Sequence, residues 1–205
     1  MATNLRFINR SQDSGKSSVL LFQKNLSTDL SELPFAWRVI QNCGYDCYHP
    51  FVYSYHVEIS INDESGNYTP HVTAAAGQLL AFGPGPMGPA LAPAGPATSP
   101  VEVQLLNAQV RGAMDVNIFR NDLLLARKTS IAPQQKAVFQ FLPSLWIGIA
   151  SQVEQGAALS AAVVSEANTE LPLLGVARAD IVMTGGGGGV KAQPFAFTLE
   201  NIVKA

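Results

Sequence analysis

Polar and apolar side chains alternate with a period of two over residues 51–62, which read FVYSYHVEISIN. Apolar or aromatic residues occupy the odd positions from Phe51 to Ile61, and polar residues occupy the even positions from Ser54 to Asn62. Successive side chains of a β-strand point to opposite faces of the sheet. The pattern therefore predicts one half-buried antiparallel strand over residues 51–61, ended by the turn-forming stretch ESGNYTP.

Short segments of the same character recur along the chain and are separated by turn-forming residues. The Asn121-Asp122 pair predicts a hairpin turn, and Pro133 predicts another in the stretch IAPQQK. The spacing predicts an all-β fold, an antiparallel β-sandwich with jelly-roll or immunoglobulin-like topology. The additional predicted strands cover residues 5–9, 17–25, 101–107, 114–121, 123–131, 136–141, 145–151, 179–184 and 195–203.

Helix is predicted to be a minor component. The stretch STDLSELPFAW favours a short helix that starts at Ser27 or Thr28 and is limited by Pro34. Ser151 and Glu154 have capping-box spacing before a run of good helix formers, although a glycine follows two residues later. The segment SAAVVSEA within that run is compatible with either a helix or a strand.

A stretch rich in proline, glycine and alanine, residues 83–100, divides the chain near its middle. It lacks a strict Gly-X-Y repeat, which excludes collagen, and it predicts a surface connection. The expected organisation is an N-terminal β half over residues 1–82, this connection, and a C-terminal β half over residues 101–205. The two halves are expected to form separate domains or to pack as one.

The two predicted halves share three short patterns in the same order. Both contain Leu-Pro-x-x-Trp-x-x-Ile, as LPFAWRVI and LPSLWIGI, and these motifs hold both tryptophans. Each motif is preceded by an apolar segment ending in Phe-x-x-Asn and followed by an acidic residue, a strand and a glycine turn. The order is consistent with an internal duplication, although Leu-Pro before a strand is also common by chance.

Charge is sparse along the chain. Of its 205 residues only 14% are charged, 47% are hydrophobic, and the formal net charge is -2. No cluster of Lys and Arg exists that would neutralise a nucleic-acid backbone or hold the chain on an anionic membrane, so both partners are disfavoured. Weak self-repulsion makes association easier, and a homo-oligomer is expected.

The N-terminal stretch MATNLRFINRSQDSGKSS has no apolar segment followed by a small-residue cleavage site. No run of about 18 apolar residues is present, so no membrane-spanning helix is expected. The predicted location is cytoplasmic, and export without a signal peptide stays compatible with the sequence.

Residues 42–50, NCGYDCYHP, hold both cysteines and the first of the three histidines. A closed zinc site needs four ligands, and Cys43, Cys47, His49 and His71 would supply them if the chain returned beside this loop. A Cys43–Cys47 disulfide is a second interpretation, but it would close a very short loop and conflicts with a reducing compartment. The favoured interpretation is a loop with two reduced thiols.

No complete catalytic motif is present, neither Gly-x-Ser-x-Gly nor His-Glu-x-x-His. Tyr45, Tyr48 and Tyr68 lie in predicted loops, and loops on a rigid sandwich commonly carry binding contacts. The leading hypothesis is a non-catalytic binding or self-assembly protein that contacts a partner, a glycan or a lipid surface, as lectin-like and toxin-like modules do. The alternative is a metal-dependent enzyme or sensor built on the four candidate zinc ligands.

Overall fold

The structure is a computed structural model that describes residues 2–13, 17–27, 33–188 and 192–205. Its secondary structure consists of sixteen strands and one helix of six residues among these described residues. Ten of the twelve strand pairings among the described residues are antiparallel. The two parallel pairings join β1 (Ala2–Asn9) to β15 (Val176–Gly186) and β7 (Gln78–Gly85) to β9 (Val103–Asn107). The predicted all-β, sandwich-like fold is confirmed.

The chain forms two compact units, and neither follows the predicted halves. Unit 1 comprises Met1–Lys24, Leu33–Ser54 and Pro143–Ala205, and unit 2 comprises Asn25–Glu32 and Tyr55–Leu142. Residues 83–100 were expected to be a connection, but they lie inside unit 2, where residues 83–85 end strand β7 (Gln78–Gly85) and residues 88–96 form strand β8 (Gly88–Pro96). Their Pro-rich composition is compatible with a strand because β8 lies at a sheet edge, where a missing backbone N–H is tolerated.

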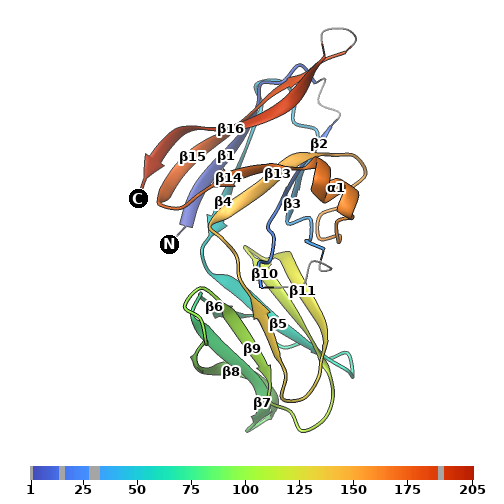
Figure 1. Ribbon diagram of the computed structural model, residues 1–205, viewed down its shortest axis with the longest axis vertical. Coiled ribbons are helices and arrows are strands. Elements are labelled where there is room, and N and C mark those ends of the chain that lie inside the picture. The colour runs from blue at the N-terminus through green and yellow to red at the C-terminus, as the bar shows by residue number, and fades with distance from the viewer. Residues whose placement is uncertain (1, 14–16, 28–32, 189–191) are drawn as a thin grey trace. The chain divides into compact units, whose positions relative to one another are not determined.

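Unit 1 contains two four-stranded sheets (Figure 1). Sheet A has the order β16-β15-β1-β4, and sheet B has the order β14-β13-β2-β3. The strands of unit 1 are β1 (Ala2–Asn9), β2 (Ser18–Phe22), β3 (Arg38–Ile40), β4 (Tyr48–Ser54), β13 (Ser144–Ala150), β14 (Thr169–Pro172), β15 (Val176–Gly186) and β16 (Gln193–Lys204).

Unit 2 also contains two four-stranded sheets. Sheet D has the order β11-β10-β5-β6, and sheet E has the order β12-β9-β7-β8. The strands of unit 2 are β5 (Val57–Asp63), β6 (Val72–Ala74), β7 (Gln78–Gly85), β8 (Gly88–Pro96), β9 (Val103–Asn107), β10 (Met114–Arg120), β11 (Leu123–Ile131) and β12 (Lys136–Phe139).

The predicted strand over residues 51–61 is divided between the two units. β4 ends at Ser54 and β5 begins at Val57. Phe51 and Tyr53 therefore belong to unit 1, whereas Tyr55 and the aliphatic part of the alternation belong to unit 2. Both parts keep their expected buried faces, since Tyr53 and Ile59 are almost inaccessible to solvent. The alternation alone does not reveal the boundary between β4 and β5, because the odd-numbered residues are apolar or aromatic both before and after it.

Strand β2 of sheet B is buried on both faces. Val19 and Leu21 of β2 point to one face, whereas Leu20 and Phe22 point to the other, and all four are buried. The second face is covered by Leu159 and Ala167, which lie on either side of helix α1 (Ala161–Glu166), and by Ala36, which precedes β3. These residues form one apolar cluster with Leu20 and Phe22. A strand that is buried on both faces needs a continuous apolar run, as β2 has, instead of alternating apolar and polar residues.

The local predictions have mixed outcomes. The Asn121-Asp122 hairpin is confirmed, with both residues at positive φ between β10 and β11. The turn around Pro133 connects β11 to β12, which lie in different sheets, so it is not a hairpin. The helix starts later than the capping-box spacing suggested, because Ser160 is the N-cap and its side chain accepts a hydrogen bond from the backbone N–H of Val163.

Apart from Leu142, the two Leu-Pro-x-x-Trp motifs lie in unit 1. One precedes β3 and the other enters β13, and these two strands flank β2 in sheet B. The compact units therefore do not correspond to the two halves that carry the shared patterns. The other predicted helix, starting at Ser27 or Thr28, falls largely on residues 28–32, which lie outside the described residues.

Replacing Gly148 by alanine tests the covered face of sheet B. A Cβ atom at Gly148 of β13 would overlap the Cα and Cβ atoms of Ala167. We expect Gly148→Ala to lower the free energy of unfolding by about 1–3 kcal/mol in urea denaturation, because the two segments would have to separate. The control Gly188→Ala places its Cβ in open space and should change stability by less than about 0.5 kcal/mol. Equal stability of both variants would contradict the packing.

Candidate functional site

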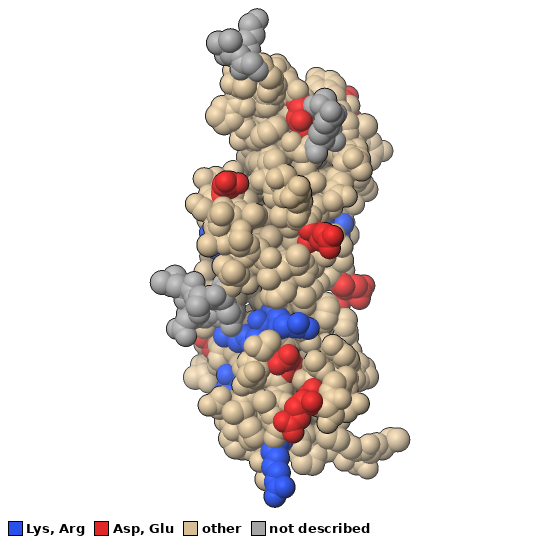
Figure 2. Space-filling view, turned by 90° about the vertical axis from the view of Figure 1, so that its right-hand side faces the viewer, with Lys and Arg blue, Asp and Glu red and all other residues tan. Residues whose placement is uncertain are grey.

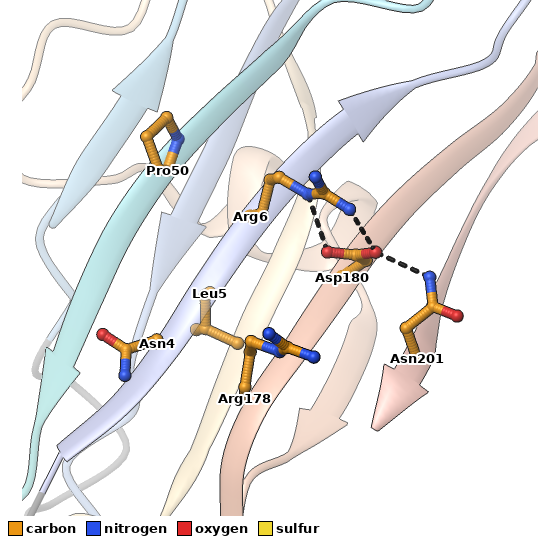
Figure 3. Close-up of a pocket in the computed structure, with 7 residues that line it drawn as sticks. All are labelled: Asn4, Leu5, Arg6, Pro50, Arg178, Asp180 and Asn201. Carbon is orange, nitrogen blue, oxygen red and sulfur yellow. Dashed lines mark hydrogen bonds and ion pairs between the residues drawn. The ribbon is translucent and has the colours of Figure 1, made fainter. Parts of the chain in front are cut away.

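A pocket opens on sheet A of unit 1, where strands β1, β4, β15 and β16 lie side by side (Figure 3). Its volume is about 430 Å³, within the usual range for small-molecule sites. Its walls combine two guanidinium groups, two side-chain amides, one carboxylate and an apolar surface that includes Leu5 and Pro50. The lining residues are Asn4, Leu5, Arg6, Pro50, Arg178, Asp180 and Asn201.

The centre of the pocket is a bidentate ion pair between β1 and β15. Arg6 Nε donates to Asp180 Oδ1 at 2.9 Å, and Arg6 Nη2 donates to Asp180 Oδ2 at 2.8 Å. Asn201 Nδ2 from β16 donates to Asp180 Oδ2 at 2.7 Å. The register explains the contact, because Arg6 and Asp180 are direct neighbours in the parallel pairing of β1 and β15.

These three hydrogen bonds hold Asp180 as a carboxylate. The hydrogen bonds from Arg6 lower the pKa of Asp180 most, and Asn201 and the positive charges of Arg6 and Arg178 lower it further against the opposing effect of burial. The same hydrogen bonds and charge raise the pKa of Arg6. The Asp180 side chain is only 7% exposed, whereas that of Arg6 is 47% exposed. The carboxylate is thus fixed, and the outer part of the guanidinium faces solvent.

A β-bulge aims Asn201 at the carboxylate. Between the pairs Asp180–Glu200 and Arg178–Val203, β16 advances by one residue more than β15. Asn201 lies within this irregularity and has a φ of 50°, a left-handed conformation that asparagine tolerates better than most residues. Bulges of this kind redirect a side chain locally, and here the amide reaches the pocket.

Arg178 and Tyr48 complete the surroundings of the ion pair. Arg178 is exposed and forms no hydrogen bond or ion pair with another described residue, although its charge lowers the pKa of Asp180 (Figure 3). Tyr48 of β4 places its ring 5.6 Å from the Arg6 Cζ atom, a cation–π contact. The pocket therefore presents more N–H donors than acceptors and carries one net positive charge from its three charged side chains.

Charge elsewhere on the surface is dispersed. Figure 2 shows acidic and basic side chains as small islands among uncharged residues on the face in view. The stretch of residues 65–101 contains no Asp, Glu, Lys or Arg at all. Because charged residues are sparse in this chain, a pocket lined by two arginines and one aspartate differs from the rest of the surface.

The predicted zinc ligands are distributed over both units. Cys43, Cys47 and His49 belong to unit 1, whereas His71 belongs to unit 2. Cys43 is a buried free thiol whose pKa is raised, first by burial and then by the neighbouring Cys47, and Cys47 is an exposed free thiol. A raised pKa disfavours the thiolate that zinc requires.

Asn9 organises the loop around the two cysteines. Its side-chain amide donates to the carbonyl of Cys43 at 2.6 Å, and its backbone N–H donates to the carbonyl of Cys47 at 3.1 Å. Its own carbonyl accepts a hydrogen bond from the N–H of Asp46 at 2.6 Å. Residues 43–47 therefore form a hydrogen-bonded loop against the end of β1, and residues 48–50 begin strand β4.

The three predicted contact tyrosines are all largely exposed, with exposed fractions of 61–70%. Tyr45 lies in the loop before β4, and Tyr48 lies in β4 itself, beside the charged pocket. Tyr68 belongs to unit 2 and lines a second hollow of about 440 Å³ formed with Phe82 and the tip of the β7–β8 hairpin. Of the predicted contacts, only Tyr48 adjoins the ion pair.

A different set of potential metal ligands converges in unit 2. One donor atom each of Glu58, His71 and Asp122 lies within 4.8 Å of the others, and this is the one such group of at least three among the described residues. His71 is its sole member from the predicted zinc set.

Comparisons with protein families, with curated proteins and with solved structures found no match. None of the helical structure among the described residues is long and apolar enough to span a membrane. Function is therefore inferred from the geometry of the sites.

The sequence prediction missed Arg6, Asp180 and Asn201. Each is a polar residue inside a predicted strand, LRFIN, ADIVMT or FAFTLENIV. An isolated Arg and an isolated Asp in two apolar strands are a signal of possible pairing, but 174 positions separate them. Only the strand order and register reveal that they meet.

Replacing Asp180 by asparagine tests the ion pair through the pH dependence of stability. The pKa of Asp180 is lowered in the folded chain, below about 3.9 in the unfolded chain. Its stabilisation is therefore complete above about pH 5 and is lost as the pH falls below about 4 and through the folded pKa. At pH 7 we expect Asp180→Asn to be less stable than wild type by about 1–2 kcal/mol in urea denaturation.

The difference between wild type and Asp180→Asn should shrink as the pH falls below about 4 and through the lowered pKa of the folded chain. Asp46→Asn is the control, because Asp46 is exposed and its side chain has no hydrogen bond to a described residue. A difference that stays constant over this pH range would show that the carboxylate charge is not what stabilises the sheet.

Proposed function

We propose that the chain is a non-catalytic binding protein whose pocket on sheet A takes a small anionic group, a carboxylate or a phosphate. The observation that carries the proposal is Arg178, an exposed arginine without a hydrogen-bonded partner among the described residues, placed beside an ion pair that is already complete. An acidic glycan is the preferred source of that group, and an anionic lipid headgroup is the other.

The donors of the pocket favour an anion over a neutral ligand. Asp180 already accepts three hydrogen bonds, so its carboxylate has little capacity left to bind hydroxyl groups. The guanidinium of Arg178 and the amides of Asn4 and Asn201 line the same cavity. Guanidinium groups bind carboxylates and phosphates with two parallel N–H···O hydrogen bonds, and the fixed Arg6–Asp180 pair would keep the neighbouring donors in place.

The same geometry supports a binding role without catalysis. Asp180 is a weak base because its pKa is lowered, and general bases function best with a pKa near the working pH. The residues that line the pocket include no Ser, Cys, His or Lys that would serve as a nucleophile. The side chains of this pocket therefore favour ligand binding over catalysis.

The binding proposal is tested with Arg178→Gln. Wild-type protein is applied to a glycan array that contains sialylated, uronic-acid, phosphorylated and neutral glycans, and to liposomes with and without phosphatidylserine. We expect acidic glycans to bind and neutral ones not to bind. Arg178→Gln should weaken binding at least about tenfold, since a hydrogen bond between charged groups contributes about 1.5–3 kcal/mol, and added salt should weaken it as well.

The matched control is Arg111→Gln, because Arg111 is an exposed arginine of unit 2, outside the pocket. Equal loss of binding in both variants would assign the effect to general charge instead of the pocket. Binding to phosphatidylserine liposomes alone would identify the lipid headgroup as the source of the anion. Absence of binding to every anionic probe would overturn the proposal.

Self-association is a second candidate function, favoured by strand β16. This strand has twelve residues, lies at an edge of sheet A, and exposes Ile202 and Val203 by 46% and 43%. A long edge strand with exposed apolar side chains offers unpaired backbone groups to a second chain. A homo-oligomer through this edge would agree with the low net charge.

Native mass spectrometry and light scattering test this second function. We expect the wild type to form an oligomer and Val203→Lys to shift it to the monomer, because a lysine on an edge strand opposes pairing. Val52→Lys is the control, since Val52 is 40% exposed on β4 at the opposite edge of the same sheet. A monomeric wild type would remove this function and would leave the anion-binding proposal untouched.

A further inference from the structure

We propose that unit 2 contains a binding site for a zinc-type divalent cation, formed by Glu58, His71 and Asp122. The three side chains come from three separate segments: strand β5, the residue before β6, and the turn between β10 and β11. The site is independent of the anion pocket, because all three residues belong to unit 2.

The donor atoms are close enough to share one ion. They lie within 4.8 Å of one another, and His71 Nδ1 is 3.7 Å from Glu58 Oε2. A tetrahedral zinc ion with ligand distances of about 2.0–2.2 Å places its ligands about 3.4 Å apart. Small side-chain rotations therefore suffice, and no backbone movement is required. With three protein ligands, the fourth position would be open to water.

The imidazole is held in position by an aromatic neighbour. The His71 ring stacks on Phe119 with a centroid distance of 4.4 Å and an interplanar angle of 26°. Phe119 is the direct cross-strand partner of Glu58 in sheet D, so both side chains project from the same face. Stacking on Phe119 thus brings the imidazole to the side of the sheet from which the Glu58 carboxylate projects.

The turn fixes the third ligand. Asp122 has a φ of 62° in the two-residue turn between β10 and β11, and its backbone N–H donates to Glu58 Oε2 at 3.4 Å. This hydrogen bond links the turn to the carboxylate of β5. The three ligands are therefore connected to one another before any ion binds, which reduces the ordering that binding would require.

The local charge favours a divalent cation. Among the described residues, no Lys or Arg nitrogen lies within ion-pair distance of either Glu58 or Asp122. Two carboxylates held together without a Lys or Arg partner repel each other, and a divalent ion would offset both charges. The imidazole selects for zinc-type ions, since Mg²⁺ and Ca²⁺ prefer ligand sets made of oxygen alone.

Isothermal titration of zinc chloride into untagged, chelator-treated full-length protein tests the site. We expect one equivalent to bind and a large excess of Mg²⁺ not to displace it. His71→Phe keeps an aromatic ring to stack on Phe119 but removes the ligand nitrogen. Asp122→Asn keeps a residue that tolerates positive φ but removes the charge. Each variant should weaken zinc binding at least about tenfold, with an unchanged circular dichroism spectrum in the absence of metal.

The matched controls are His49→Phe and Cys47→Ser, which alter the zinc ligands predicted from the sequence. Both should bind zinc as the wild type does, and Co²⁺-loaded wild-type protein should lack the intense near-ultraviolet absorption of a thiolate ligand. Loss of binding in these controls, or a thiolate band, would overturn the proposal in favour of the cysteine loop. Absence of stoichiometric zinc binding by wild-type protein would overturn it outright.

Discussion

The parallel pairing of β1 with β15 is the contact on which unit 1 depends. It joins the first strand of the chain to one that lies 174 positions further on, as the Arg6–Asp180 pair shows. On the inner face the pairing sets Phe7 beside Ile181, and both are fully buried. A one-residue slip in register would exchange the inner and outer faces, so apolar burial inside and the ion pair outside specify the same alignment.

This pairing also explains why the two units interleave along the chain. Parallel neighbours require a long connection, and here the connection contains β2 to β4, all of unit 2, and β13 and β14. The entropic cost of closing a loop grows only slowly with its length, so the long insertion is compatible with a stable unit 1. The insertion is expected to slow the folding of unit 1, because contacts between segments far apart in the sequence form slowly. Unit 2, drawn mostly from Tyr55–Leu142, has the shorter connections.

Local pattern predicts most of the strands, although not β3, β6, β7, β8 or β14, and it is insufficient to assign strands to sheets. The alternation from Phe51 to Ile61 correctly identifies buried faces, and the Asn121-Asp122 pair correctly identifies a hairpin. Both signals depend on neighbours a few residues apart. The division after Ser54, the strand formed by the Pro-rich residues 88–96 and the pairing of β1 with β15 all depend on which distant segment covers which face. A single sequence does not contain that information locally.

The same distinction applies to the candidate sites. Cys43, Cys47 and His49 are conspicuous in the sequence because their side chains are reactive. In the structure, however, Asn9 donates hydrogen bonds to the backbone carbonyls of Cys43 and Cys47, and Cys43 is a buried thiol. His71 is conspicuous in the sequence for the same reason. The potential metal ligands that lie beside it, Glu58 and Asp122, look in the sequence like an ordinary strand residue and an ordinary turn residue. The pairing of β5 with β10 brings Glu58 close to the turn that holds Asp122, just as the register of β1 and β15 brings Arg6 to Asp180. In a sheet protein with so few charges, sites arise where register brings polar side chains of distant strands together.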